Sequence, residues 1–278
     1  MKRTAIVFLL LAAASLSTFT QAPASNIRKV NLSQAEIDRI VKKFTANEGL
    51  FRQALDIYAF TRNATIQTLG MGGQITGTYR RDSLLTFTAD GNRVEKIEYA
   101  PVPTLTEIEV TPSDIDNLGG IDPFAIEPAK LSQYNFSFVG KEKIDDLDLF
   151  VFDVSPKVMP EAKKNGPKLF TGRVWVDDRD LMIVKSKGKA VPEIKNERFP
   201  VVETWRENVD GKYWFPSYSS SDDELVFDDG HSVKLKFRVK YTDYRQARTD
   251  VKIISEDDVV DETSKPAPKA TPTPKKPE

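Results

Sequence analysis

The side chains that could perform nucleophilic or acid–base chemistry are few. The chain has no cysteine and a single histidine, His231, which follows Asp229-Gly230 in a sequence typical of a turn. A serine triad would need this histidine, and no Gly-x-Ser-x-Gly motif is present to accompany it. Metal sites built from histidine or cysteine ligands are excluded for the same reason. We therefore expect a protein that is not an enzyme and that carries no cofactor.

Acidic residues are the remaining candidates for metal or acid–base chemistry. Asp177, Asp178 and Asp180 resemble the start of a calcium loop, but the glycine and the terminal glutamate of such a loop are missing. We interpret them as turn residues, and the acidic run 222–224 as a charged edge that stays soluble. The sequence thus predicts no metal site. A hydrolase that uses a pair of carboxylates is kept as a third hypothesis, behind the two binding functions that are described at the end of this subsection.

A helix is predicted near the N-terminal end of the chain, after residue 32. Residues 33–36, Ser-Gln-Ala-Glu, match a capping box, in which the serine and the glutamate satisfy each other's backbone donors. Apolar residues then recur at helical spacing up to Phe44, which predicts a helix over 33–44. Gly49 is expected to weaken or end this helix, with a further turn or two after it.

Strand-like segments dominate the chain after residue 56. Five pairs of them flank short turn sequences, which predicts an antiparallel meander and not β–α–β units. The predicted pairs are 75–89 with 93–100, 134–143 with 147–155, 170–176 with 181–187, 201–208 with 213–220, and 225–227 with 232–244. The last strand alternates apolar and basic residues, so one face should be buried and the other solvated.

Prolines interrupt the stretch 100–130, which we interpret as a flap or connector packed on the sheet, with a short helix over 112–118. The two chain ends have a different character. A basic, an apolar and a small-residue stretch follow one another in residues 1–24, which predicts a cleaved secretory signal. Residues 256–278 are acidic and then rich in lysine and proline, typical of a disordered tail.

A single domain is expected over residues 25–255, between the signal peptide and the tail. The acidic balance of this body argues against binding to nucleic acid, whereas the basic tail is a candidate for contact with a membrane surface. We expect a periplasmic protein and a monomer.

The helix 33–44 and the hairpin 172–185, with the sequence GRVWVDDRDLMIVK, resemble the LolA/LolB lipoprotein-carrier superfamily. The strand pair 136–154 also fits, and the resemblance covers residues 33–245. It implies an α+β, mainly β fold: an antiparallel sheet curled into a half-barrel, with an N-terminal helix and short covering helices. It also implies a non-catalytic carrier or chaperone that binds acyl chains or a lipidated protein.

On such a scaffold, the concave face of the sheet is wider than its own side chains can fill. Exposed apolar surface costs roughly 25 cal/mol per Å², so a lid or an acyl chain should cover it. Strand parity selects nine side chains expected to line an apolar ligand-binding groove: Phe136, Phe138, Phe150, Phe152, Val174, Val176, Leu235, Phe237 and Val239. The same spacing is typical of plain core. The alternative hypothesis is a periplasmic protein-interaction or sensor domain on the same scaffold.

Overall fold

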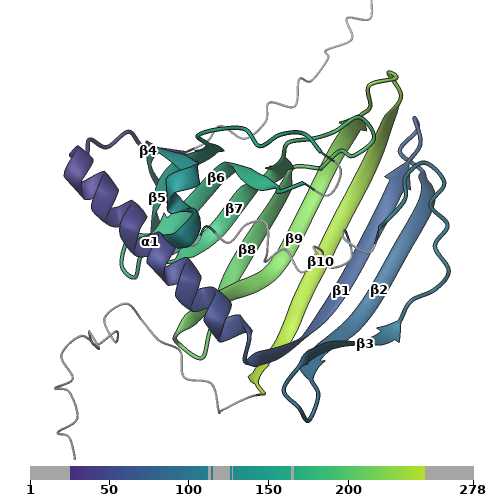
Figure 1. Ribbon diagram of the computed structural model, residues 1–278, viewed down its shortest axis with the longest axis horizontal. Helices are drawn as coiled ribbons and strands as arrows, with labels where there is room; N and C mark the ends of the chain where they lie inside the picture. The colour runs from purple at the N-terminus through teal and green to yellow at the C-terminus, as the bar shows by residue number, and fades with distance from the viewer. Residues whose placement is uncertain (1–25, 112–113, 115–125, 127, 164–165, 248–278) are drawn as a thin grey trace, which may run out of the picture.

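The computed structural model describes residues 26–247, except 112–113, 115–125, 127 and 164–165 (Figure 1). The predicted signal peptide 1–24, the tail 256–278 and nearly all of the short helix 112–118 lie outside the described residues. None of the described helices is long and apolar enough to cross a membrane. The described elements are α1 (Gln34–Leu55), β1 (Tyr58–Leu69), β2 (Ile75–Phe87), β3 (Arg93–Tyr99), the 3-10 helix η1 (Pro128–Gln133), β4 (Tyr134–Ile144), β5 (Leu147–Pro156), β6 (Leu169–Asp177), β7 (Ile183–Val191), β8 (Val202–Val209), β9 (Tyr213–Val226) and β10 (Ser232–Gln246).

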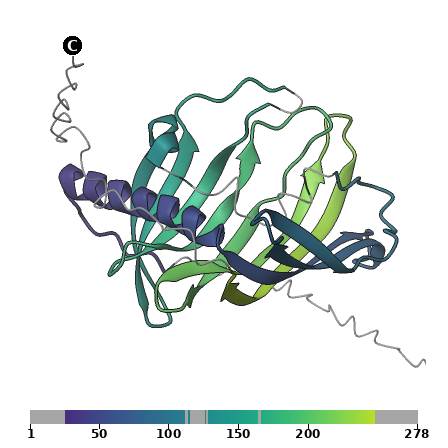
Figure 2. The same ribbon diagram turned by 60° about the horizontal axis from the view of Figure 1, so that its bottom comes forward.

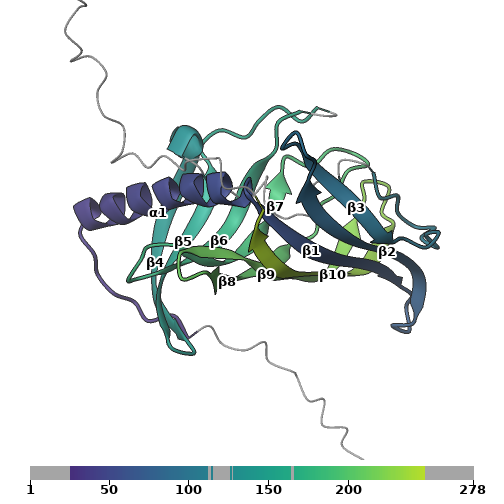
Figure 3. The same ribbon diagram turned by 90° about the horizontal axis from the view of Figure 1, so that it is seen from below.

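The ten strands form one antiparallel sheet, in the order β3-β2-β1-β10-β9-β8-β7-β6-β5-β4. Strands β4 to β10 follow one another as a meander, and β1 pairs with β10, which places the hairpins β1–β2–β3 beside the last strand. Figures 2 and 3 show the sheet curled, with α1 lying across it. We call the face that α1 covers the inner face and the opposite one the outer face. The predicted fold class, a mainly β half-barrel with an N-terminal helix, is confirmed.

Two predictions about the strands need correction. β1 was not delimited from the sequence, and it lies inside the sheet between β2 and β10, third from the β3 edge. The segments 213–220 and 225–227 are parts of one strand, β9, because it pairs without interruption with β10 from Tyr218 to Val226. The acidic run 222–224 therefore lies inside a strand and not at a free edge.

The helix α1 is longer than predicted. Its N-terminus has the predicted capping box: the Ser33 N–H donates to Glu36 Oε2 (2.9 Å), and the Glu36 N–H donates to Ser33 Oγ (3.3 Å). Gly49 does not end the helix, which continues to Leu55, and a Cβ at this position would make only ordinary contact with the Pro128 side chain, at 3.4 Å. Phe51, two residues later, is fully buried, and its burial offsets the roughly 1 kcal/mol that a glycine costs inside a helix.

The apolar face of α1 joins two parts of the core. Its first half, with Ile40, Val41 and Phe44, packs against β4 to β7, and its second half packs against β1, β9 and β10. Within the first part, the Phe170 ring lies across Gly188, where a Cβ would come within 2.4 Å of the ring. The inner face is therefore partly filled by this helix and by large side chains such as Phe170, for which Gly188 leaves room.

An ion pair fixes α1 to the sheet between these two parts. Glu48 of α1 is fully buried and accepts two hydrogen bonds from Arg206 of β8, at 2.6 and 3.0 Å. The Arg206 guanidinium also lies 4.4 Å from the centre of the Phe51 ring. Asn47 adds a second connection, because its Nδ2 donates to the carbonyl oxygens of Asp180 and Leu181. The helix is therefore held by polar bonds as well as by apolar packing.

We expect Glu48→Leu to destabilise the fold by about 3–5 kcal/mol, because the change leaves a buried guanidinium without its partner. Urea denaturation measures this loss. The double variant Glu48→Leu/Arg206→Met should recover most of the stability, since no buried charge remains. A single variant as stable as the wild type would contradict the anchoring role of the pair.

Candidate functional site

The inner face has two differently covered parts. We call the part under the first half of α1, formed by β4 to β7, the helix half, and the part formed by β9, β10, β1 and β2 the flap half. The flap itself is residues 100–111. The Thr104 N–H donates to the Thr78 carbonyl oxygen (2.9 Å), and Thr68 Oγ1 donates to Glu107 (2.9 Å). The described part of the predicted connector is thus packed on the sheet.

Gly77 of β2 lets the flap cross the strand in direct contact, because a Cβ there would lie 2.8 Å from Leu105 Cα. Beyond this crossing, Leu105, Ile108 and Val110 pack against the apolar cluster of the flap half. A partly open hollow of about 470 Å³ is lined mainly by the flap and reaches Tyr79 of β2. The flap half is therefore covered partly by the second half of α1 and partly by the flap, along which this hollow lies.

The nine predicted ligand-lining residues fall into two groups. The helix half holds six of them, packed in or against one cluster with Phe44: Phe136, Phe138, Phe150, Phe152, Val174 and Val176. The flap half holds Phe237 and Val239, and Leu235 is buried on the same strand. The structure thus brings all nine to the sheet but separates them under two covers. Contact of these residues with a ligand stays a prediction.

The helix half is densely packed. The Phe44 ring lies 5.6 Å from the rings of both Phe136 and Phe152, and Phe138 lies 5.3 Å from Phe152, all measured between ring centres. Phe152 is fully buried. Aromatic pairs at these distances stabilise a core. The Phe44 side chain of α1 therefore occupies the space that a ligand would need in the helix half.

Hydroxyl groups on the inner face were missed by the sequence analysis. The Thr204 and Ser219 hydroxyls, on β8 and β9, lie 2.8 Å apart, and Tyr241 of β10 is buried with its pKa raised to about 12 by that burial. Ser221 is 5% exposed and its Oγ has no hydrogen-bond partner. The signal was available, since these positions share the parity of apolar neighbours on the same strands.

A charged network lies at the β1–β3 end of the inner face. Glu95 accepts hydrogen bonds from Arg62 (2.6 Å), Arg81 (2.7 Å) and Ser83 (2.6 Å). The hydrogen bond from Arg81 is the largest influence on the Glu95 carboxyl; burial opposes it, and Ser83 and Arg62 reinforce it, so that its pKa falls to about 2. Arg62 is 3% exposed and lies on the same buried face of β1 as Phe60 and Ala64, so its charge points inward.

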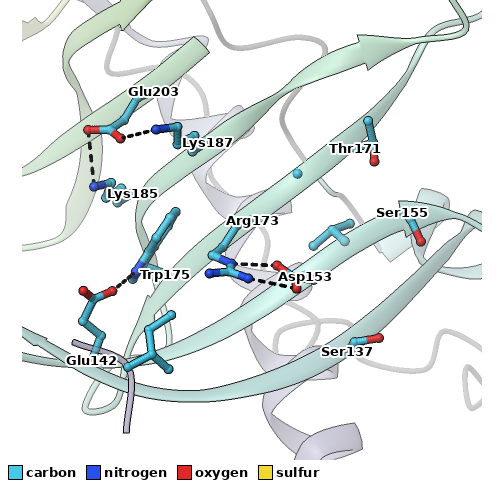
Figure 4. A pocket seen from close by; sticks show the side chains of 13 residues that line it. Ser137, Glu142, Asp153, Ser155, Thr171, Arg173, Trp175, Lys185, Lys187 and Glu203 are labelled. Carbon is cyan, nitrogen blue, oxygen red and sulfur yellow. Dashed lines mark hydrogen bonds and ion pairs between the residues drawn. The ribbon is translucent and has the colours of Figure 1, made fainter. Parts of the chain in front are cut away.

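The outer face carries a second hollow, of about 650 Å³, over β4 to β8 (Figure 4). Its charged side chains pair with one another: Arg173 with Asp153 at 2.7 Å, and Lys185 and Lys187 with Glu203 at 3.3 and 3.6 Å. Lys185 also lies over the rings of Trp175 and Trp205, at 4.8 and 4.0 Å from their centres. Because its cations and anions already satisfy each other, this hollow is a weaker candidate for a ligand site.

The three aspartates compared with a calcium loop lie at the end of β6 and in the turn that follows it. The Asp180 N–H donates to the Asp177 carboxylate and Lys141 pairs with Asp178, as expected for turn residues. The His231 ring stacks on Phe227, with 4.4 Å between ring centres. Within the described part of the chain, no group of three or more His, Cys, Asp or Glu residues could hold a metal ion.

The Glu95 network should make stability depend on pH in acid. Because its pKa is lowered in the folded protein, Glu95 contributes stability above about pH 4.5 and loses that contribution as the pH falls towards 2. The melting temperature of Glu95→Gln should therefore change less over this interval than that of the wild type. Glu98→Gln, an exposed position on the same strand, is the control. Parallel melting curves for wild type and Glu95→Gln would contradict this role.

No family model matches the chain, and no curated protein matches it. Solved structures with likenesses to it include a DUF1329 family protein from Desulfovibrio piger (14% identity, 73% of this chain and 93% of that one, TM-score 0.31). A LolA superfamily protein from Nitrosomonas europaea is 16% identical (73% and 94%, TM-score 0.30), and MucB in complex with MucA(peri) is 10% identical (74% and 93%, TM-score 0.22). The family that the sequence resembles is thus among the structural neighbours. At these TM-scores the likenesses carry no argument about function, which has to rest on this chain's own residues.

Proposed function

We propose that this chain is an exported, non-catalytic carrier or chaperone of the periplasm that holds an acyl chain or a lipidated protein on the inner face of its half-barrel. The observation that carries the proposal is the flap half, where the flap packs on apolar residues of the sheet and a partly open hollow of about 470 Å³ runs along it. The guest is expected along β10 and β1, beside Phe237, and not beneath α1.

The difference between the two covers supports this location. α1 is held by the buried pair of Glu48 and Arg206 and by a continuous apolar face, so lifting it would expose an ion pair as well as core. The flap is held through Thr104 and Glu107 and by apolar side chains that are only partly buried. Removal of the flap therefore costs less free energy than removal of the helix.

Binding needs no chemistry, only an exchange of covers. Three partly buried flap side chains, Leu105, Ile108 and Val110, contribute less than the roughly 1.5–3 kcal/mol that each would give if fully buried. An acyl chain that buries about a dozen methylenes contributes roughly 10 kcal/mol, at about 0.8 kcal/mol for each. A guest can therefore replace the flap on β1 and β10, and the flap can replace the guest at release.

We expect Glu107→Ala to tighten the binding of an acyl chain. The change removes the hydrogen bond to Thr68 that holds the flap, and a hydrogen bond contributes about 0.5–1.5 kcal/mol, so affinity should rise about threefold to tenfold. Titration of the delipidated protein with a fluorescent fatty-acyl probe measures this. Glu109→Ala is the matched control, since Glu109 forms no such bond with the described part of the sheet. Unchanged or weaker binding by Glu107→Ala would argue against exchange of covers.

Substitutions in the two halves should have different effects. Phe237→Asp introduces a charge at a partly buried position in the flap half, so the protein should fold and lose uptake of the acyl probe. Phe152→Asp places a charge in the densest part of the helix half and should prevent folding. Circular dichroism and the same titration separate the two results. A folded Phe237→Asp protein with normal uptake would remove the flap half from the site.

A second candidate function, recognition of a partner polypeptide, is favoured by the edge strand β3. This strand pairs on one side only, with β2, and exposes Ile97 and Tyr99 at 48% and 51%. An extended peptide can add to such an edge through backbone hydrogen bonds. Lipid in an organic extract of the purified protein, detected by mass spectrometry, supports the carrier. Delipidated protein that captures a periplasmic partner but takes up no acyl probe supports this second function.

A further inference from the structure

We propose that Ser221 is the polar anchor of the guest: its hydroxyl donates a hydrogen bond to the carbonyl oxygen of an ester-linked or amide-linked acyl chain. This inference rests on the proposed function and adds to it the chemical group that the inner face recognises. It starts from the state of Ser221, which is 5% exposed and whose Oγ forms no hydrogen bond.

A buried hydroxyl without a partner is unusual and costly. More than nine in ten buried polar groups in proteins are satisfied, and an unsatisfied one costs about as much as a lost hydrogen bond. The neighbouring hydroxyls of the inner face do not share this state, because Thr204 and Ser219 bond to each other at 2.8 Å. Ser221 therefore retains an available donor beside two hydroxyls that have partners.

The strand register connects Ser221 to the hollow along the flap. Ser221 on β9 is directly paired with Phe237 on β10, Phe237 with Ile66 on β1, and Ile66 with Tyr79 on β2. Tyr79 lines the hollow of about 470 Å³. Paired residues on adjacent strands point to the same face, and three strand spacings amount to about 14 Å. An apolar track over Phe237 and Ile66 thus leads from the hollow to one available hydroxyl.

This arrangement fits an acyl chain with a neutral carbonyl at one end. The chain would lie along Phe237 and Ile66, and its carbonyl oxygen would accept the hydrogen bond of Ser221. An ionised carboxylate fits less well, because Asp223 lies two residues along the same face of β9, about 7 Å away, and the available hydroxyl supplies only one hydrogen bond to a desolvated charge. A trapped water is also a poor fit, since a buried water needs two to four polar partners.

The test compares three probes of equal chain length: a methyl ester, an N-methyl amide and the parent alkane. Each displaces a fluorescent acyl probe from the delipidated full-length protein, and the wild type should bind one or both carbonyl compounds about threefold to tenfold more tightly than the alkane. Ser221→Ala should lose this preference and keep the alkane affinity. Its melting temperature should not fall, because the change breaks no hydrogen bond. A preference for the ester alone or the amide alone supports the proposal and identifies the linkage.

Ser219→Ala is the matched control on the same strand and face. It breaks the bond to Thr204, so its melting temperature should fall while its preference for the carbonyl probes remains. A Ser221→Ala protein that keeps the full preference, whether or not its stability falls, would overturn the role of Ser221. If the wild type binds none of the three probes, the proposed carrier function fails as well, which separates that failure from the failure of the anchor alone.

Discussion

The buried ion pair of Glu48 and Arg206 is the interaction on which the arrangement of the inner face depends. It joins the middle of α1 to β8, close to the middle of the sheet, and it does so with two hydrogen bonds at 2.6 and 3.0 Å. A helix held only by apolar side chains could slide along the curved face, since apolar contacts are not directional. A bidentate pair has one geometry, so it fixes the position of α1 along the sheet. That position determines which part of the inner face α1 covers and which part is left to the flap.

The asymmetry of the inner face follows from this placement. Phe44 and its aromatic neighbours fill the space over β4 to β7, so that part of the sheet is ordinary core. The remainder of the sheet is wider than the end of α1 can reach, and it combines apolar residues with hydroxyls and with the paired charges of Arg62 and Glu95. The Thr204 and Ser219 hydroxyls and the charges of Arg62 and Glu95 are paired, whereas the Ser221 Oγ has no hydrogen-bond partner.

Local patterns were sufficient to predict the helix cap and the antiparallel hairpins, because turn residues and alternation act over a few neighbouring positions, whereas the half-barrel was implied by the resemblance to the carrier superfamily. The extension of α1 through Gly49 could not be predicted in this way, since it depends on the burial of Phe51 against distant strands. The pairing of Glu48 with Arg206 joins positions far apart in the chain, and so does the pairing of β1 with β10. For the same reason, strand parity could place the nine candidate residues on one face of the strands, but it could not show which of them lie in the helix half and which lie in the flap half.

The pairing of β1 with β10 also determines when the protein can fold. Tyr58 lies opposite Gln246, so one edge of β1 has to wait for the last strand before its backbone groups are satisfied, whereas the other edge pairs with β2. Contacts this distant along the chain form slowly. During synthesis, β1, β2 and β3 could pair with one another, but the edge of β1 that faces β10 would remain unpaired until the last strand had emerged. The sheet is therefore completed only by the last strand of the described chain.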